Sequence, residues 1–203
     1  MPSALPNTLT VARLVLSPVF FLLIIADDPV KRQVSIAVFM VAALTDWYDG
    51  EIARRYGSIT NLGKFLDPLA DKFLTSAAFA GFAVLGIVHW WMVIVIVIRD
   101  FLITVLRSIA ENRNEHIVTS KLAQTKTFIQ MAVLYYLLLL IVGREIPWVQ
   151  SILGDMLPAL LQRDFVYALM LAVTALTLWT GIQYLIDNRN IIGRLLSGSR
   201  RVL

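Results

Sequence analysis

The 203-residue chain contains no cysteine, which excludes a disulfide framework and thiolate chemistry. It is also poor in charge, since Asp, Glu, Lys and Arg form 16% of its residues, against about 25% in an ordinary soluble domain. It lacks the alternating segments of about ten residues that mark a membrane barrel. Apolar residues, in contrast, reach 58%. This composition predicts an all-α integral membrane protein with one domain, residues 1–203.

Several segments are apolar over about 20 residues, the length that a helix needs to cross a bilayer. Irregular backbone cannot face lipid, so we expect each segment to be a helix. The six expected transmembrane helices are Thr8–Ala26, Val34–Arg54, Phe65–Val88, Trp90–Ala110, Leu122–Val142 and Phe165–Ile186. The long connection 143–164 carries Trp148 and several leucines, which predicts a short helix lying in the membrane interface.

Lysines and arginines in the short loops predict the orientation, because they gather on the cytoplasmic side. One side has Arg54, Arg55, Lys64, Arg113, Lys121, Arg189, Arg194, Arg200 and Arg201. The other side has Lys31, Arg32, Arg144 and Arg163. Both termini are therefore expected in the cytoplasm, with Trp90, Trp91 and Trp148 at the outer interface.

Four aspartates gather between residues 46 and 71: Asp46, Asp49, Asp67 and Asp71. The first two are spaced i,i+3 and the last two i,i+4, so each pair shares a helix face. Because the second and third helices are antiparallel neighbours, all four should lie at one depth, inside the membrane near its cytoplasmic face. Pro68, between the second pair, is expected in a first helical turn, where proline is tolerated.

A charge at membrane depth costs about 2.5–3.5 kcal/mol, so four carboxylates need protons or cations. Four carboxylates on two helices are suited to two divalent ions. Hard oxygen ligands favour Mg²⁺ or Mn²⁺ over Zn²⁺. The alternative is a solvated cytoplasmic rim of aspartates beside arginines.

The spacing Asp-x2-Asp-Gly-x2-Ala-Arg-x8-Gly-x3-Asp-x3-Asp resembles the signature of the CDP-alcohol phosphatidyltransferases. It is matched by Asp46, Asp49, Gly50, Ala53, Arg54, Gly63, Asp67 and Asp71. The resemblance implies a six-helix membrane enzyme, usually a homodimer, that displaces CMP from a CDP-linked donor with an alcohol and uses divalent metal. Further segments, PNTLTVARLVLSPVF, RDFLITVLRSIA, KLAQTKTFIQM and LTLWTGIQYL, resemble the phosphatidylglycerophosphate synthases of the bacterial inner membrane.

The resemblance also implies roles for the signature residues, with CDP-diacylglycerol as the donor. The implied metal ligands are Asp46, Asp49, Asp67 and Asp71, and Asp71 is the candidate general base for the acceptor hydroxyl. The implied CDP-binding residues are Gly50, Ala53, Arg54 and Gly63. Other interpretations stay open: close helix packing for Gly50 and Ala53, a turn for Gly63, and a positive-inside anchor for Arg54.

The resemblance gives glycerol 3-phosphate as the acceptor, a dianion that needs cations. Arg107, Lys121 and Lys126 are expected near the depth of the aspartates and are the candidate acceptor-phosphate pocket, with Arg113 as a further candidate. Arg99 and Asp100 lie near mid-membrane, where charges usually pair. An ion pair is therefore the first interpretation and an acceptor contact the second.

Two kinds of alternative remain. A sister enzyme would use inositol phosphate, phosphatidylglycerol (cardiolipin synthesis) or serine as the acceptor; the basic cluster argues only against serine. A divalent-cation transporter would need acidic groups along the membrane normal or a gated midplane site, whereas these carboxylates gather at one face.

Overall fold

The computed structural model describes residues 5–56, 61–113, 115, 121–154 and 156–197. Within these ranges, the side chains of residues 5–9, 46–56, 61–65, 67, 121, 196 and 197 lie outside the description. The described part is helical and contains no strand. Its helices are α1 (Leu5–Ile24), α2 (Pro29–Tyr56), α3 (Asn61–Val84), α4 (Trp90–Asn112), α5 (Lys121–Gly143), α6 (Pro147–Leu153), α7 (Met156–Leu160), α8 (Arg163–Asp187) and α9 (Arg189–Ser197).

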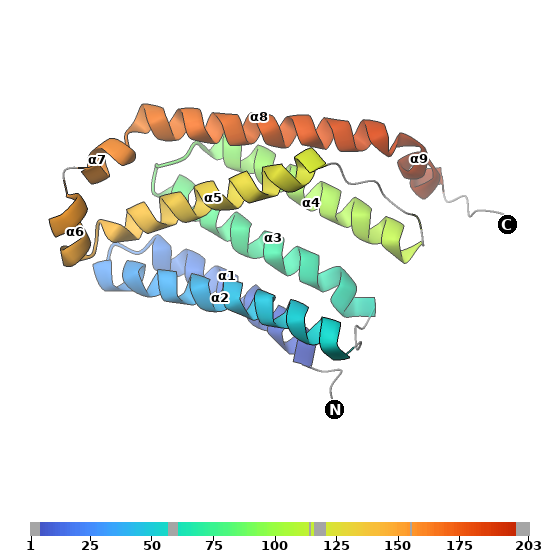
Figure 1. Cartoon of the computed structure of the whole chain (residues 1–203), viewed down its shortest axis with the longest axis horizontal. Coiled ribbons are helices and arrows are strands. Elements are labelled where there is room, and N and C mark those ends of the chain that lie inside the picture. Colours follow the sequence, from blue (N-terminus) through green and yellow to red (C-terminus); the bar gives the residue numbers. More distant parts are fainter. Residues whose placement is uncertain (1–4, 57–60, 114, 116–120, 155, 198–203) are drawn as a thin grey trace.

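The long helices α1, α2, α3, α4, α5 and α8 form a bundle in which successive helices run in opposite directions (Figure 1). Helix α1 packs on α2 and α3, α3 packs on α4, and α8 packs on α4 and α5. One end of the bundle, here called the site end, is where α2, α4 and α8 finish and α3 and α5 begin. The opposite end, here called the far end, carries α6 and α7.

The six apolar segments all form long helices, as the sequence predicts, but some boundaries differ. Helix α3 ends at Val84, four residues before the predicted end. The cause is Gly86, whose φ of 71° is left-handed and stops the helix at low steric cost. The connection after α5 holds two short helices, α6 and α7, where the sequence predicted one.

The expectation that Pro68 lies in a first turn is wrong, because α3 begins at Asn61 and Pro68 is inside the helix. Residues 61–64, of which Asn61 and Lys64 are polar, extend the helix beyond its apolar part. Proline has no N–H, so the carbonyl of residue 64 receives no intrahelical bond from residue 68. Pro68 lies between Asp67 and Asp71, and the carbonyl that it leaves without an intrahelical bond is three residues before Asp67.

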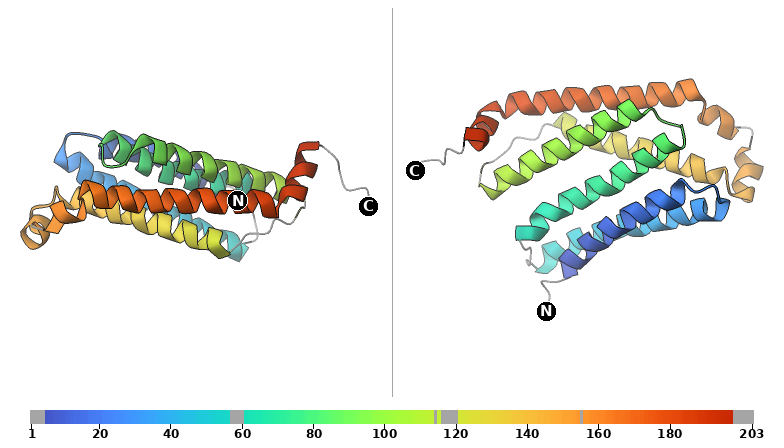
Figure 2. Two further views of the ribbon diagram at one scale, coloured as in Figure 1. Left: turned by 90° about the horizontal axis from the view of Figure 1, so that it is seen from above. Right: turned by 180° about the vertical axis from the view of Figure 1, so that it is seen from behind.

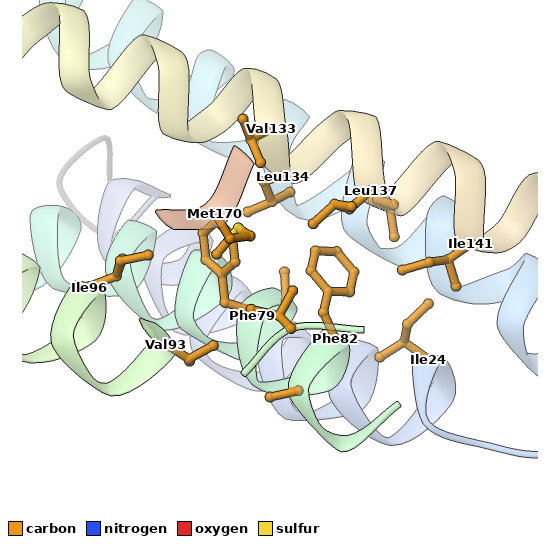
Figure 3. Close-up of a cluster of buried hydrophobic side chains, with 14 of the residues drawn as sticks. Ile24, Phe79, Phe82, Val93, Ile96, Val133, Leu134, Leu137, Ile141 and Met170 are labelled. Atoms are coloured by element: carbon orange, nitrogen blue, oxygen red, sulfur yellow. The ribbon is translucent and has the colours of Figure 1, made fainter. Parts of the chain in front are cut away.

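The apolar core fills the far half of the bundle. Figure 3 shows Phe79 and Phe82 of α3 among side chains from α1, α4, α5 and α8. The two rings meet edge to face, with centroids 6.1 Å apart. A second ring pair, Phe20 with Phe39, joins α1 to α2 at 5.2 Å. Aromatic pairs of this kind stabilise packing beyond the area that they bury.

The buried residues change character along five of the helices. Nearer the site end they are polar: Thr10, Arg13 and Ser17 of α1; Thr75 of α3; Asp100, Thr104 and Ser108 of α4; Lys126 and Gln130 of α5; Thr177 and Thr180 of α8. Nearer the far end they are apolar: Phe20 and Ile24; Phe79 and Phe82; Met92, Val93 and Ile96; Leu134, Leu137 and Ile141; Val166, Met170 and Val173. Ala70 and Leu74 of α3 and Ala110 of α4 are buried apolar exceptions near the site end. The bundle therefore has a mainly polar interior in one half and a mainly apolar interior in the other.

The outer surface differs from that of a soluble protein, because large apolar side chains are exposed along the bundle. Examples are Leu22, Ile98, Phe128, Leu139 and Trp179. In the described chain, Leu122–Gly143 and Met156–Asp187 are long and apolar enough to cross a membrane. An apolar exterior around buried charged groups is typical of a membrane protein.

Candidate active site

A cavity of about 530 Å³ opens in the polar half, between α3, α4, α5 and α8. Helix α3 contributes Asp71 and Lys72, and α5 contributes Gln124 and Thr127. Helix α4 contributes Arg99, Asp100, Thr104, Arg107 and Glu111, and α8 contributes Tyr184. The cavity therefore has carboxylates and cations on facing helices, in the half of the bundle where the signature segment lies.

Asp71 is the signature aspartate whose side chain the structure describes. It lines the cavity, and its Oδ2 accepts a hydrogen bond from Lys72 Nζ at 3.0 Å. Asp46 and Asp49 belong to the half of α2 that finishes at the site end, and Asp67 belongs to the half of α3 that begins there. The side chains of these three residues lie outside the description, as do those of Gly50, Ala53, Arg54 and Gly63.

The donor set suits a hard divalent cation, because all four signature side chains are carboxylates. Among the side chains that the structure describes, no three His, Asp or Glu residues are close enough to hold a metal. That set contains only Asp71 of the four signature aspartates. The chemistry of the four signature residues therefore fits a hard divalent metal, and Asp71 is the one of them described on the cavity wall.

Asp100 is the centre of a buried polar network in the cavity wall. Its Oδ1 accepts from Lys126 Nζ and, at 3.1 Å, from an Arg99 guanidinium nitrogen. Its Oδ2 accepts from Gln130 Nε2 at 3.0 Å. Asp100 is 5% exposed and Lys126 is 1% exposed. The ion pair predicted for Arg99 and Asp100 is thus confirmed, and Lys126 joins it.

Arg99 extends from this network to α8, where its second terminal nitrogen donates to Thr180 Oγ1 at 3.1 Å. The side chain of Arg99 lies over Gly181. A Cβ atom at residue 181 would lie 3.0 Å from Arg99 Cγ and 3.3 Å from its Nε. Because glycine has no side chain, it leaves space for the Arg99 side chain to extend to the cavity.

The structure gives different surroundings to three of the four cations predicted for the acceptor phosphate, Arg107, Lys126 and Arg113. Arg107 lines the cavity, is half-exposed, and lies 3.3 Å from Glu111 through its Nε. Lys126 is held behind the wall by Asp100. Arg113 is not among the lining residues, and it donates to the carbonyl of Leu195 at 3.1 Å. Lys121 begins α5, and its side chain lies outside the description.

Sequence reasoning missed Tyr184. Its side chain is 5% exposed, and it lines the cavity. Its hydroxyl is buried and has no hydrogen-bond partner among the described residues. A signal existed, because Thr177, Thr180, Gly181 and Tyr184 follow the spacing i, i+3, i+4, i+7 in an otherwise apolar helix.

Helix α1 also turns polar side chains inward near the site end. Thr10 and Arg13 are fully buried, and Ser17 Oγ donates to the Arg13 carbonyl at 2.7 Å. The helix packs against α2 and α3, the two helices that carry the signature aspartates. Its inward polar residues therefore adjoin the signature segment.

A family model described as CDP-alcohol phosphatidyltransferase matches residues 3–182 of the chain. The chain belongs to the CDP-alcohol phosphatidyltransferase family. The resemblance in the signature residues is thereby confirmed, and the protein is an enzyme of this family. The matched region runs from α1 through most of α8, and it ends two residues before Tyr184, the α8 residue that lines the cavity.

Individual relatives carry more specific names. A Bacillus subtilis protein named CDP-diacylglycerol–glycerol-3-phosphate 3-phosphatidyltransferase is 39% identical over 147 residues, covering 66% of this phosphatidyltransferase and 76% of the relative. A Rickettsia typhi protein of the same name is 33% identical over 181 residues, covering 89% and 94%. A Mycobacterium tuberculosis protein named probable phosphatidylglycerophosphate synthase is 41% identical over 129 residues, covering 62% and 61%.

Proposed function

We propose that this phosphatidyltransferase transfers the phosphatidyl group from CDP-diacylglycerol to glycerol 3-phosphate, giving phosphatidylglycerophosphate and CMP. The observation that carries the proposal is the cavity, which has Asp71 on α3 facing cations on α4. The names of the relatives agree with these substrates. We further propose six membrane spans, a site end facing the cytoplasm of a bacterial inner membrane, cytoplasmic termini and a homodimer.

The donor would bind at the signature segment, with its acyl chains in the lipid. Asp46, Asp49, Asp67 and Asp71 would hold two divalent ions, Mg²⁺ or Mn²⁺. Gly50, Ala53 and Gly63 would leave space for the cytidine, and Arg54 would bind a donor phosphate through its planar fork. When bound, the ions offset negative charge that builds on the departing CMP.

In the reaction, Asp71 would take the proton from the acceptor hydroxyl, whose oxygen forms a bond to the phosphorus that carries diacylglycerol. The bond between that phosphorus and the phosphate oxygen of CMP breaks, and CMP leaves with the bonding electrons. Lys72, whose Nζ donates to Asp71 Oδ2, orients the carboxylate on the cavity wall. The acceptor must therefore enter the cavity with its hydroxyl towards α3.

The opposite end of the acceptor is a phosphate, and the α4 wall supplies cations for it. Arg107 is the first candidate because it lines the cavity and is half-exposed, and Lys121 begins the neighbouring helix. Arg99 and the buried Tyr184 hydroxyl are further donors on the walls. Lys126 would act through Asp100, whose position it fixes. Arg113 is not part of the proposed pocket, because the described partner of its side chain, Leu195, is on α9.

Purified protein in detergent or nanodiscs would test the acceptor. CDP-diacylglycerol and Mg²⁺ or Mn²⁺ are supplied with glycerol 3-phosphate, inositol phosphate, phosphatidylglycerol or serine in turn, and CMP release is measured. We expect release with glycerol 3-phosphate. Fast release with another acceptor and none with glycerol 3-phosphate would overturn the choice of acceptor but not the family.

The variant Arg107→Ala then tests the pocket. A hydrogen bond to a charged group contributes about 1.5–3 kcal/mol, so the KM for glycerol 3-phosphate should rise about tenfold or more. The KM for the donor should change little. Arg163→Ala, which removes an exposed arginine at the far end, is the matched control. An equal rise in both KM values would contradict the proposed position of Arg107.

A further inference from the structure

Helix α9 is a short C-terminal helix that the proposed reaction does not use. Asn188, between α8 and α9, is 1% exposed, and its Nδ2 donates to the Tyr184 carbonyl at 2.9 Å. At this junction the chain leaves the axis of α8, and α9 turns towards the end of α4 (Figure 2). Leu195 of α9 is buried, and α9 contacts α4 and α8. The helix is thus docked on the protein.

Two arginines join α9 to the end of α4, and each of the two helix ends contributes one of them. Arg194 of α9 donates to Glu115 Oε2 at 3.0 Å. Arg113, which follows α4, donates to the Leu195 carbonyl at 3.1 Å. Residue 195 is in the last turn of α9, where carbonyls lack intrahelical partners, so Arg113 also caps that helix. We call these four residues, Arg113, Glu115, Arg194 and Leu195, the α9 clasp.

The clasp connects two walls of the cavity without lining it. The last turns of α4 carry Arg107 and Glu111, and the last turn of α8 carries Tyr184. Glu115 is tied to the same end of α4, because its N–H donates to the Ala110 carbonyl at 2.9 Å. Asn188 links α9 to Tyr184 on the other side. A change in the clasp would therefore alter the separation of Arg107 and Tyr184.

We propose that the α9 clasp is a positioning device that sets the affinity for the acceptor by holding the ends of α4 and α8 together. The substrate side of this inference rests on the proposed function, since it takes Arg107 and Tyr184 as acceptor contacts. Donor binding at the α2–α3 segment should not depend on the clasp, because the main contacts of α9 are with α4 and α8. A change in the clasp should therefore alter the affinity for the acceptor and leave the affinity for the donor unchanged.

Arg194→Ala and Glu115→Gln test this inference. We expect each to raise the KM for glycerol 3-phosphate about fivefold, which corresponds to about 1 kcal/mol for a partly exposed ion pair. The donor KM and kcat should stay within about twofold by the same reasoning. The double variant should lose no more than either single variant, and exchanging the charges (Arg194→Glu with Glu115→Arg) should restore part of the affinity. Arg189→Ala, which removes an exposed arginine from the same helix, should leave all three constants unchanged.

Amide hydrogen exchange gives a second readout that needs no substrate. Arg194→Ala should speed exchange in the last turn of α4, residues 109–113, and Arg189→Ala should not. If exchange at residues 109–113 stays unchanged, the clasp does not hold the end of α4, and this conclusion holds for any acceptor. Faster exchange with unchanged acceptor KM would overturn its role in affinity. Failure of the proposed function is distinguishable, because it would appear in the wild-type acceptor assay and leave the exchange result standing.

Discussion

The two halves of this bundle are built by the same helices but bury different side chains. In the far half, α4 buries Met92 and Ile96, and α5 buries Leu137 and Ile141. In the site half, the same two helices bury Asp100 and, paired with it, Lys126. The apolar half holds the helices together by packing, whereas the polar half uses ion pairs and hydrogen bonds around a cavity.

The difference teaches how a membrane enzyme can hold charged substrates without losing its fold. A buried ion pair is weak evidence for stability, because desolvation offsets much of its attraction. The site half therefore depends on the packing of the far half for rigidity. The polar groups of the site half are then available to recognise substrates. Variants in the far half should accordingly change stability alone, whereas variants that face the cavity should change kinetic constants and loss of a buried ion-pair partner should also cost stability.

Asp71→Asn should have the largest effect, because it removes the proposed base from the site half. General bases contribute about 10²–10⁴-fold to rate, so kcat should fall by that factor while donor binding is largely retained. CMP release and the binding of CDP-diacylglycerol measure the two quantities. Asp164→Asn, at the start of α8 in the far half, is the control. Near-normal turnover of Asp71→Asn would exclude Asp71 as the base.

Asp100→Ala should come next, because it leaves Lys126 buried without its carboxylate. Breaking a buried pair costs about 3–5 kcal/mol, whereas replacing both partners by apolar residues is often neutral. Thermal unfolding in detergent should therefore show a large loss for Asp100→Ala and a smaller one for Asp100→Leu with Lys126→Met. Equal losses would mean that Asp100 does not serve chiefly to balance Lys126.

Phe79→Ala should weaken the far half alone. Loss of a buried phenylalanine costs about 3–5 kcal/mol, and we expect the low end because lipid is as apolar as the core. The unfolding temperature should drop, while both KM values of the remaining folded enzyme stay unchanged. A rise in either KM would show that the apolar half also sets the geometry of the site.

Gly181→Ala should have the smallest effect of these variants, because it adds one methyl group against Arg99. Overpacking of this kind typically costs about 1–3 kcal/mol. The displaced guanidinium should raise the acceptor KM a few-fold and leave the donor KM unchanged. Gly193→Ala is the control, since a Cβ atom there would have open space. If the two variants have the same acceptor KM, Arg99 does not contact the acceptor.

Much of the fold follows from local sequence. The apolar runs predict α4 and α5 to within two residues, because loop residues bound these segments closely. The errors have local causes: residues 61–64 extend α3 beyond its apolar part, and Gly86 ends it early. Such boundaries depend on residues such as Asn61, Lys64 and Gly86, whose effect on a helix end is not given by hydropathy.

The site was only partly predictable. The spacing of the aspartates predicts the family, and the family match confirms it. The pairing of Lys126 with Asp100 was not foreseen, because it depends on how α5 is rotated against α4. Arg113 was a further candidate phosphate ligand because of its charge, yet its described partner lies 82 residues away in sequence, on α9. Such a contact across the bundle cannot be predicted from the charge of a single residue.

The central claim is that carboxylates of α2 and α3 hold divalent ions at the edge of the cavity. The most direct test counts the Mn²⁺ ions bound per chain by the purified protein with CDP-diacylglycerol, beside Asp49→Asn and Asp67→Asn. We expect two ions for the wild type and fewer for each variant, with CMP release falling in parallel. Active wild-type protein that binds no ion, or variants that keep both ions, would contradict the claim.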